Sequence, residues 1–204
     1  MVQYDTSMLA VSLTIAFLTS IIELLGEGRG VVVIPYATVV PLLLILPRLI
    51  YTVKKASLSA QWLSRMERLS FFAMLLNAPG SLYFHEAGFG YDRFLHFAVG
   101  IIAPQMFLLL ALPFLSTPIS KSKALTVLAF FSFISLFLWE GFQFSIDQLF
   151  GTHLFFDVHQ VIQVDFWEDI IFGGIGVALS LFYLHIRLDK ILSLAKPRSL
   201  ITDH

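Results

Sequence analysis

Long apolar runs, separated by short polar stretches, dominate the pattern of hydrophobic and polar positions along the chain. A transmembrane helix takes roughly 20 apolar residues, and most of these runs approach that length. Because the runs are continuous and do not alternate with a period of two, the pattern argues against a β-barrel. It predicts an all-α polytopic membrane protein with about six transmembrane helices. The predicted spans are 8–25, 31–49, 71–84, 93–115, 124–146 and 166–186.

Punctuation within and before these runs refines the prediction. The run 31–49 contains three prolines, which predicts a kinked helix. The run 71–84 is short and contains Asn77 and Pro79, so we expect a broken or re-entrant helix covered by protein. Residues 1–7 contain no Lys or Arg, which favours a retained first span over a cleaved signal peptide. No linker or repeat divides the chain, so we expect one transmembrane domain over 1–204.

Composition excludes several classes of protein. Of the 204 residues, 57% are hydrophobic and 13% are charged, whereas a soluble domain has about 45–50% apolar and about 25% charged residues. This excess excludes a soluble globular enzyme and a disordered chain. The net charge of −1 and the lack of a basic stripe exclude nucleic-acid binding. Without cysteine there is no disulfide, thiolate metal site or cysteine nucleophile.

The basic residues predict how the chain is oriented. With six spans, 11 of the 13 Lys and Arg residues fall on one side, and only Arg29 and Arg93 fall on the other. The positive-inside rule then places both termini in the cytoplasm of a multi-pass protein of the cytoplasmic (inner) membrane. Leu58, Trp62 and Met66 follow helical spacing within the basic segment 54–68. This spacing predicts an interfacial helix on anionic lipid, with an ordinary cytoplasmic loop as the alternative.

Acidic residues and histidines gather on the predicted outer side, at the ends of the last three spans. Asp92 and His96 share a helix face at the start of the fourth span, and Asp165 and Asp169 repeat that spacing in the sixth. Glu140 lies about 9 Å below the outer end of the fifth span, and His96 and Asp169 lie roughly 6 Å inside theirs. Three helices therefore offer ionisable groups at nearly one depth. The stripe of Glu140 continues toward the surface through Gln143 and Asp147.

Such groups need a partner. A carboxylate in hydrocarbon costs about 2.5–3.5 kcal/mol on insertion scales, so it usually faces the bundle interior. A shared divalent cation would neutralise the cluster, and carboxylate and imidazole ligands suit Zn, Mg or Mn. Alternatively, one carboxylate keeps its proton and serves as a proton carrier or general acid. The candidate metal ligands are Asp92, His96, Glu140, Asp165 and Asp169, and Glu140 is also the candidate catalytic residue.

Structural roles compete with this interpretation. Asp92 fits an N-cap of the fourth span, and Asp165 with Glu168 resembles a capping box. The outer loop 147–165 adds a weaker metal-like spacing in His153, Asp157 and His159.

The sixth span also carries a stripe of small residues. Asp169, Gly173, Gly176 and Ser180 follow helical spacing, which allows another helix to approach closely. On the fourth span, Gly100 and Ala103 are the matching small residues.

Part of the chain, about residues 85–180, resembles a known family. The segment 90–97 (Gly-Tyr-Asp-Arg-Phe-Leu-His-Phe), the Trp139-Glu140 pair and Asp165-x-x-x-Asp169 resemble the YjdF-type family of uncharacterised bacterial inner-membrane proteins. The order of Asp92-x-x-x-His96, Glu140 and Asp169 is more distantly similar to VanZ-like membrane proteins, which are associated with glycopeptide resistance. The resemblance implies a small protein of the cytoplasmic membrane whose polar residues form a site.

Three functions follow. The first is a metal-binding membrane protein, extended in one version to a metal-dependent enzyme that acts on a membrane lipid or cell-envelope substrate. The second is a proton- or cation-coupled transporter with Glu140 as carrier. Little polarity beyond Gln105 and Ser180 in the inner halves of the last three spans argues against it. The third is a structural or partner-binding protein that uses the cluster as a hydrogen-bond network.

Overall fold

The computed structural model describes residues 7–25, 35–79, 90–115, 119–151 and 161–195. These ranges are helical and contain no strand, only an isolated antiparallel bridge between Leu58 and Ala195. The all-α class is thus confirmed. The elements are α1 (Ser7–Leu25), η2 (Pro35–Val39), α2 (Val40–Val53), α3 (Ala60–Pro79), α4 (Tyr91–Ala111), η4 (Leu112–Phe114), α5 (Lys121–Phe150) and α6 (Ile162–Leu192).

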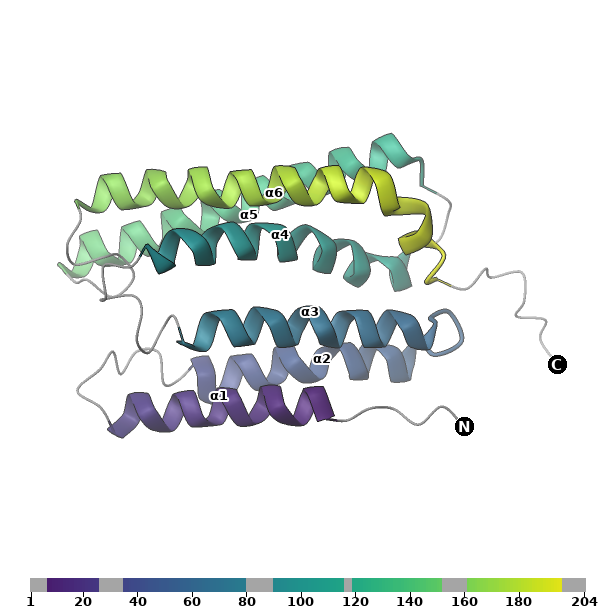
Figure 1. Ribbon diagram of the computed structural model, residues 1–204, viewed down its shortest axis with the longest axis horizontal. Helices are drawn as coiled ribbons and strands as arrows, with labels where there is room; N and C mark the ends of the chain where they lie inside the picture. The colour runs from purple at the N-terminus through teal and green to yellow at the C-terminus, as the bar shows by residue number, and fades with distance from the viewer. Residues whose placement is uncertain (1–6, 26–34, 80–89, 116–118, 152–160, 196–204) are drawn as a thin grey trace.

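The six long helices run up and down in two groups. Figure 1 shows α1, α2 and α3 together on one side and α4, α5 and α6 on the other, with consecutive helices antiparallel. Helix α3 contacts α4 across the two groups, and the most extensive contact joins α4 to α6. We call the end where α4 and α6 begin and α5 ends the acidic end. The opposite end, where α3 begins and α6 ends, is the apolar end.

The apolar end contains the main core of the protein. Trp62 of α3 and Leu58, two residues before that helix, are fully buried together with Leu109 of α4 and Leu184 of α6. The indole Nε1 of Trp62 donates a hydrogen bond of 2.7 Å to the carbonyl of Leu109. The predicted interfacial helix is therefore wrong, because Leu58, Trp62 and Met66 pack against protein. The loop alternative holds only for residues 54–59, since residues 60–68 belong to α3. Helical spacing shows which residues share a face, but it does not distinguish a face against lipid from a face against protein.

Helix α3 also differs from the predicted span 71–84. It begins at Ala60 and continues without a break to Pro79. Two charged residues of its first half contact neighbouring helices. Arg48 of α2 contacts Glu67 at 2.5 Å. Arg65 donates to Gln105 of α4 and to the hydroxyl of Tyr183 on α6, at 3.3 and 3.1 Å. Residues 80–84 lie outside the described ranges. In the second predicted span, a π-helical turn (Pro35–Val39) precedes α2, so the proline-rich segment is irregular where it begins.

Four helical segments of the described chain are long and apolar enough to cross a membrane: α1, α4 with η4, α5 and α6. The segment Ala37–Val53 is apolar but shorter. The six-span count and the sidedness of the termini stay predictions.

Glycines set the distance between α4 and α6. A Cβ atom on Gly100 would lie 2.3 Å from the carbonyl oxygen of Gly173, and one on Gly176 would lie 2.2 Å from that of Phe97. The two backbones are thus in direct contact, which only glycine permits. One turn farther along α6, the hydroxyl of Ser180 donates to the carbonyl of Ile101 at 2.7 Å. The predicted contact between the small stripe and Gly100 is confirmed, and it brings Asp169 beside the start of α4.

Candidate functional site

Three helices bring carboxylates to one imidazole at the acidic end. His96 lies in the second turn of α4, and Asp92 precedes it by one turn on the same face. The Nε2 atom of His96 lies 3.5 Å from Asp92 Oδ1 and 3.6 Å from Oδ2 of Asp169 on α6. Its Nδ1 atom lies 3.2 Å from Oε1 of Glu140 on α5. Three of the other four predicted ligands therefore surround the ring of His96.

The cluster is buried, and part of its hydrogen-bonding capacity is unused. Glu140 and Asp169 are 2% and 4% exposed. Among the residues that the structure describes, Glu140 Oε1 and Asp169 Oδ1 have no hydrogen-bond partner. The contact of Glu140 with His96 is close, but it does not have hydrogen-bond geometry. A buried carboxyl oxygen without a donor is costly, so these atoms point to a positively charged or hydrogen-donating ligand.

The spacing around Nε2 suits coordination better than hydrogen bonding. An N–H···O bond spans 2.7–3.2 Å, so both carboxylates lie beyond it. Around a tetrahedral zinc with ligand bonds of about 2.0–2.1 Å, neighbouring donor atoms are ~3.3 Å apart. One donor atom each from Asp92, His96 and Asp169 lies within 4.8 Å of the other two. These three residues could hold one metal ion with small side-chain movements.

A comparison with known protein families assigns the chain to one of them. Residues 6–190 match the family described as "Predicted membrane protein (DUF2238)". The chain belongs to this family. Since the match runs from α1 to the last turn of α6, this DUF2238 member is a membrane protein with several apolar helices. The comparisons with curated proteins and with solved structures each gave no match.

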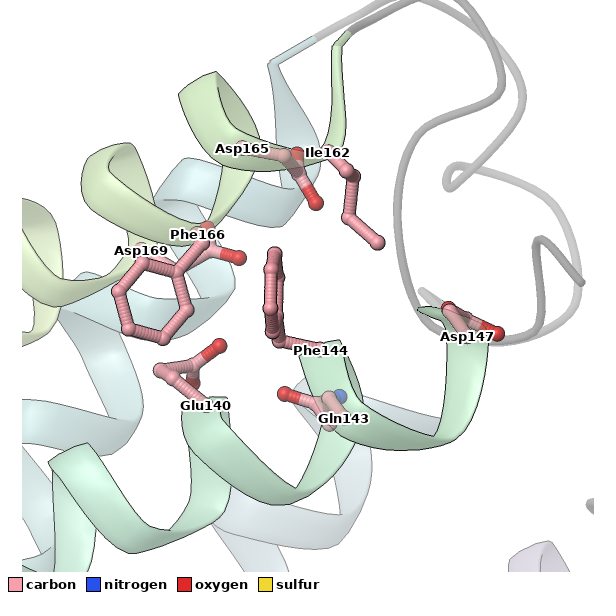
Figure 2. A pocket seen from close by; sticks show the side chains of 8 residues that line it. All are labelled: Glu140, Gln143, Phe144, Asp147, Ile162, Asp165, Phe166 and Asp169. Carbon is pink, nitrogen blue, oxygen red and sulfur yellow. The ribbon is translucent and has the colours of Figure 1, made fainter. Parts of the chain in front are cut away.

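The fifth predicted ligand of this DUF2238 member, Asp165, stands apart from the cluster. It is buried one turn before Asp169 on α6, and it lines a hollow between α5 and α6 (Figure 2). The hollow has an empty volume of ≈ 240 Å³, including space open to the exterior. Glu140 and Asp169 line its inner part, and Asp147 lines it from the last turns of α5. The predicted stripe from Glu140 to Asp147 therefore faces this hollow.

The capping roles predicted as alternatives are wrong. The residue before α4 is Gly90 with φ +64°, so Asp92 lies inside the first turn. The N-cap of α6 is Val161, which places Asp165 one turn inside that helix. Both helices begin a few residues before the apolar runs that predicted them. Their first turns contain polar residues, so the hydropathy pattern did not indicate where each helix begins. His153, Asp157 and His159 lie outside the described residues.

An ion pair that the sequence did not indicate joins α4 and α6 near the cluster. Arg93 contacts Glu168 through Nε at 2.7 Å and through a terminal guanidinium nitrogen at 2.5 Å. The pair links the first turn of α4 to the second turn of α6. Arg93 directly follows Asp92 in the chain, and Glu168 directly precedes Asp169. A separation of 75 residues leaves no local signal for such a pair.

Proposed function

We propose that this protein is a multi-pass protein of the cytoplasmic membrane that binds one divalent cation near the extracytoplasmic face. The ligands are Asp92, His96 and Asp169, and the ion is Zn, Mg or Mn. One observation carries the proposal: Nε2 of His96 faces two carboxylates at donor spacing, while Nδ1 faces a third, buried carboxylate.

Glu140 has a different role in this proposal from the other acids. A metal-bound histidine almost always donates its second ring N–H to a carboxylate or carbonyl, which fixes the ring. Glu140 Oε1 lies 3.2 Å from Nδ1, so a small rotation of its side chain would form that bond. We therefore assign Glu140 to orienting His96, in place of the direct ligation that the sequence predicts. Asp165 lines the hollow between α5 and α6, apart from these ligands, so we do not include it among them.

The arrangement of the helices supports the predicted topology. Consecutive long helices alternate in direction, and α1 begins at the same end as α6 ends (Figure 1). Six crossings with both termini in the cytoplasm agree with this arrangement and with the charge asymmetry. Glu67 of α3 is ion-paired with α2, and Arg65 is hydrogen-bonded to α4 and α6, which lowers the cost of burying that helix.

A catalytic role is an extension of the metal site. A bound cation supplies Lewis-acid chemistry, because it activates water and polarises phosphoryl or carbonyl oxygens. Because the site lies near the extracytoplasmic face of the cytoplasmic membrane, the substrate class would be a lipid or another component of the cell envelope. The resemblance to YjdF-type and VanZ-like proteins supports such a location.

Two alternatives are less well supported. A transporter that uses Glu140 as carrier needs a polar path to the apolar end, but fully buried Leu109 and Leu184 fill the bundle there. A purely structural network needs hydrogen bonds, but the contacts of Nε2 with Asp92 and Asp169 are too long for them.

Elemental analysis of the detergent-purified full chain, after chelation and reloading, tests the metal site. Near-stoichiometric cation in the wild type and its loss in His96→Ala and Asp169→Ala are the expected results. Glu140→Gln should weaken affinity by about 10–100-fold, the usual cost of losing an orienting partner. His185→Ala, which removes an exposed histidine of α6, is the matched control. A wild type without cation, or a folded His96→Ala variant that retains it, would contradict the proposal.

A further inference from the structure

We propose that the cation reaches its ligands through the hollow between α5 and α6, with Asp147 and Asp165 as an outer docking pair. This inference rests on the proposed metal site and adds the route by which the ion arrives. In Figure 2, Glu140 and Asp169 face the hollow from opposite helices, with the ring of Phe144 beside them. The outer acids, Asp147 and Asp165, line the same hollow and lie nearer to the acidic end of the bundle.

Helical spacing arranges the four carboxylates in two pairs. On α5, Asp147 follows Glu140 by seven residues, which is about 10 Å along the axis. On α6, Asp165 precedes Asp169 by four residues, about 6 Å. Since α5 and α6 are antiparallel neighbours, Asp147 and Asp165 both lie nearer to the acidic end of the bundle than Glu140 and Asp169 do. An ion that enters from the end of the bundle therefore meets Asp147 and Asp165 before Glu140 and Asp169.

The inner pair provides the evidence that a ligand belongs here. Glu140 and Asp169 are more than nine-tenths buried, line this hollow, and each have a carboxyl oxygen without a hydrogen-bond partner in the described chain. Asp169 also belongs to the metal cluster through its other oxygen, 3.6 Å from His96. The hollow is thus continuous with the cluster through a shared side chain.

Charge in the hollow favours cations. None of the residues that line it is Lys or Arg. Arg93, the only basic residue among the described turns of α4, α5 and α6 at the acidic end, is paired with Glu168. A cleft of one charge sign with low-dielectric walls raises association rates by about 10–10³-fold. The acidic lining therefore attracts cations and repels anions.

Two aromatic rings narrow the route between the pairs. Phe144 of α5 and Phe166 of α6 both line the hollow, and their ring centroids are 5.5 Å apart. Rings at this distance are in contact. An ion must displace one of them to pass from the outer to the inner acids, so these rings should limit the rates of both binding and release.

Stopped-flow exchange of Mn²⁺ or Zn²⁺ with a fluorescent chelator, on the full chain in detergent, tests the route. We expect the double variant Asp147→Asn and Asp165→Asn to slow cation uptake and release alike by about tenfold, the lower end of electrostatic steering. The equilibrium affinity should stay within about threefold, because neither acid is among the proposed ligands. Phe144→Ala should accelerate both rates by a similar factor. Asp189→Asn, an exposed acid at the apolar end, is the charge-matched control.

The outcomes separate this route from the metal site itself. If the wild type binds no cation, the proposed function fails. If the wild type binds but uptake is unchanged in the double variant and in Phe144→Ala, the route is wrong and the site stands. Slower uptake in Glu168→Gln, with normal rates in the double variant, would place the route at the α4–α6 side and overturn the inference.

Discussion

The two ends of the helical bundle are built in opposite ways. At the apolar end, Trp62, Leu109 and Leu184 are fully buried, and the polar atom of the indole is hydrogen-bonded. At the acidic end, Glu140 and Asp169 are equally buried, yet each retains an oxygen without a partner in the described chain. The first arrangement lowers the free energy of the fold and the second raises it. Buried groups that cost stability are typical of functional sites.

The glycine contact between α4 and α6 lies between the two ends. Gly100, Gly173 and Gly176 bring the backbones together, and Asp169 precedes Gly173 by one turn. The distance of 3.6 Å between Asp169 and His96 therefore depends on packing as well as on the acids themselves. Substitutions at the apolar end, at the glycine contact and at the acidic end should thus have separable effects.

The largest loss of stability is expected at the apolar end. Trp62→Ala removes a fully buried indole and leaves the Leu109 carbonyl without its donor. We expect a loss of about 3 kcal/mol, the lower end for such truncations in protein cores. Thermal unfolding in detergent measures it, with the exposed Trp139→Ala as control. Cation affinity should be unchanged in the folded fraction; reduced affinity there would show that the two ends are coupled.

Substitution at the glycine contact should reduce both the stability of the fold and the affinity for the cation. In Gly176→Ala the new Cβ meets the Phe97 carbonyl, so α6 must move away from α4. Overpacking of this kind costs about 1–3 kcal/mol, and the shift should weaken cation binding by separating Asp169 from His96. Gly174→Ala is the control, because its Cβ would make an ordinary 3.6 Å contact with Phe133. Equal thermal stability and affinity in the two variants would contradict the proposed role of this contact.

At the acidic end, a substitution should increase the stability of the cation-free protein, in contrast to the losses expected above. Glu140→Gln removes the charge of a buried carboxylate whose Oε1 has no hydrogen-bond partner in the described chain, so we expect the cation-free protein to become more stable by about 1 kcal/mol. The same variant should lose much of the stabilisation that added cation gives to the wild type. Unfolding temperatures with chelator and with excess Mn²⁺ or Zn²⁺ test both statements. A cation-free variant less stable than the wild type would identify Glu140 as a structural residue.

The smallest effect is expected at the Arg93–Glu168 pair. Its side chains are 38% and 31% exposed, and exposed ion pairs contribute about 0–1 kcal/mol. A double-mutant cycle with Arg93→Gln and Glu168→Gln measures the coupling. A coupling energy well above that range would show that the pair, as well as the glycines, holds α4 against α6.

The sequence predicted the features of the two ends that follow from residue spacing within a single helix. The i, i+4 spacing placed Asp92 beside His96, and the small stripe on α6 indicated its contact with Gly100. The paired charges of α3 and the burial of Trp62 depend on neighbouring helices, so hydropathy along the chain misplaced both. For the same reason, the sequence did not show which ring nitrogen of His96 lies nearest to Glu140. Only the packing of α5 shows that it faces the opposite nitrogen of His96.

Anomalous diffraction from crystals loaded with Zn²⁺ or Mn²⁺ tests the central claim most directly. The account predicts one anomalous peak about 2.0–2.2 Å from His96 Nε2 and from one oxygen each of Asp92 and Asp169. Glu140 should lie outside this coordination sphere and accept a hydrogen bond from Nδ1. A loaded crystal with no peak at His96, or with its imidazole hydrogen-bonded to all three carboxylates, would contradict the account.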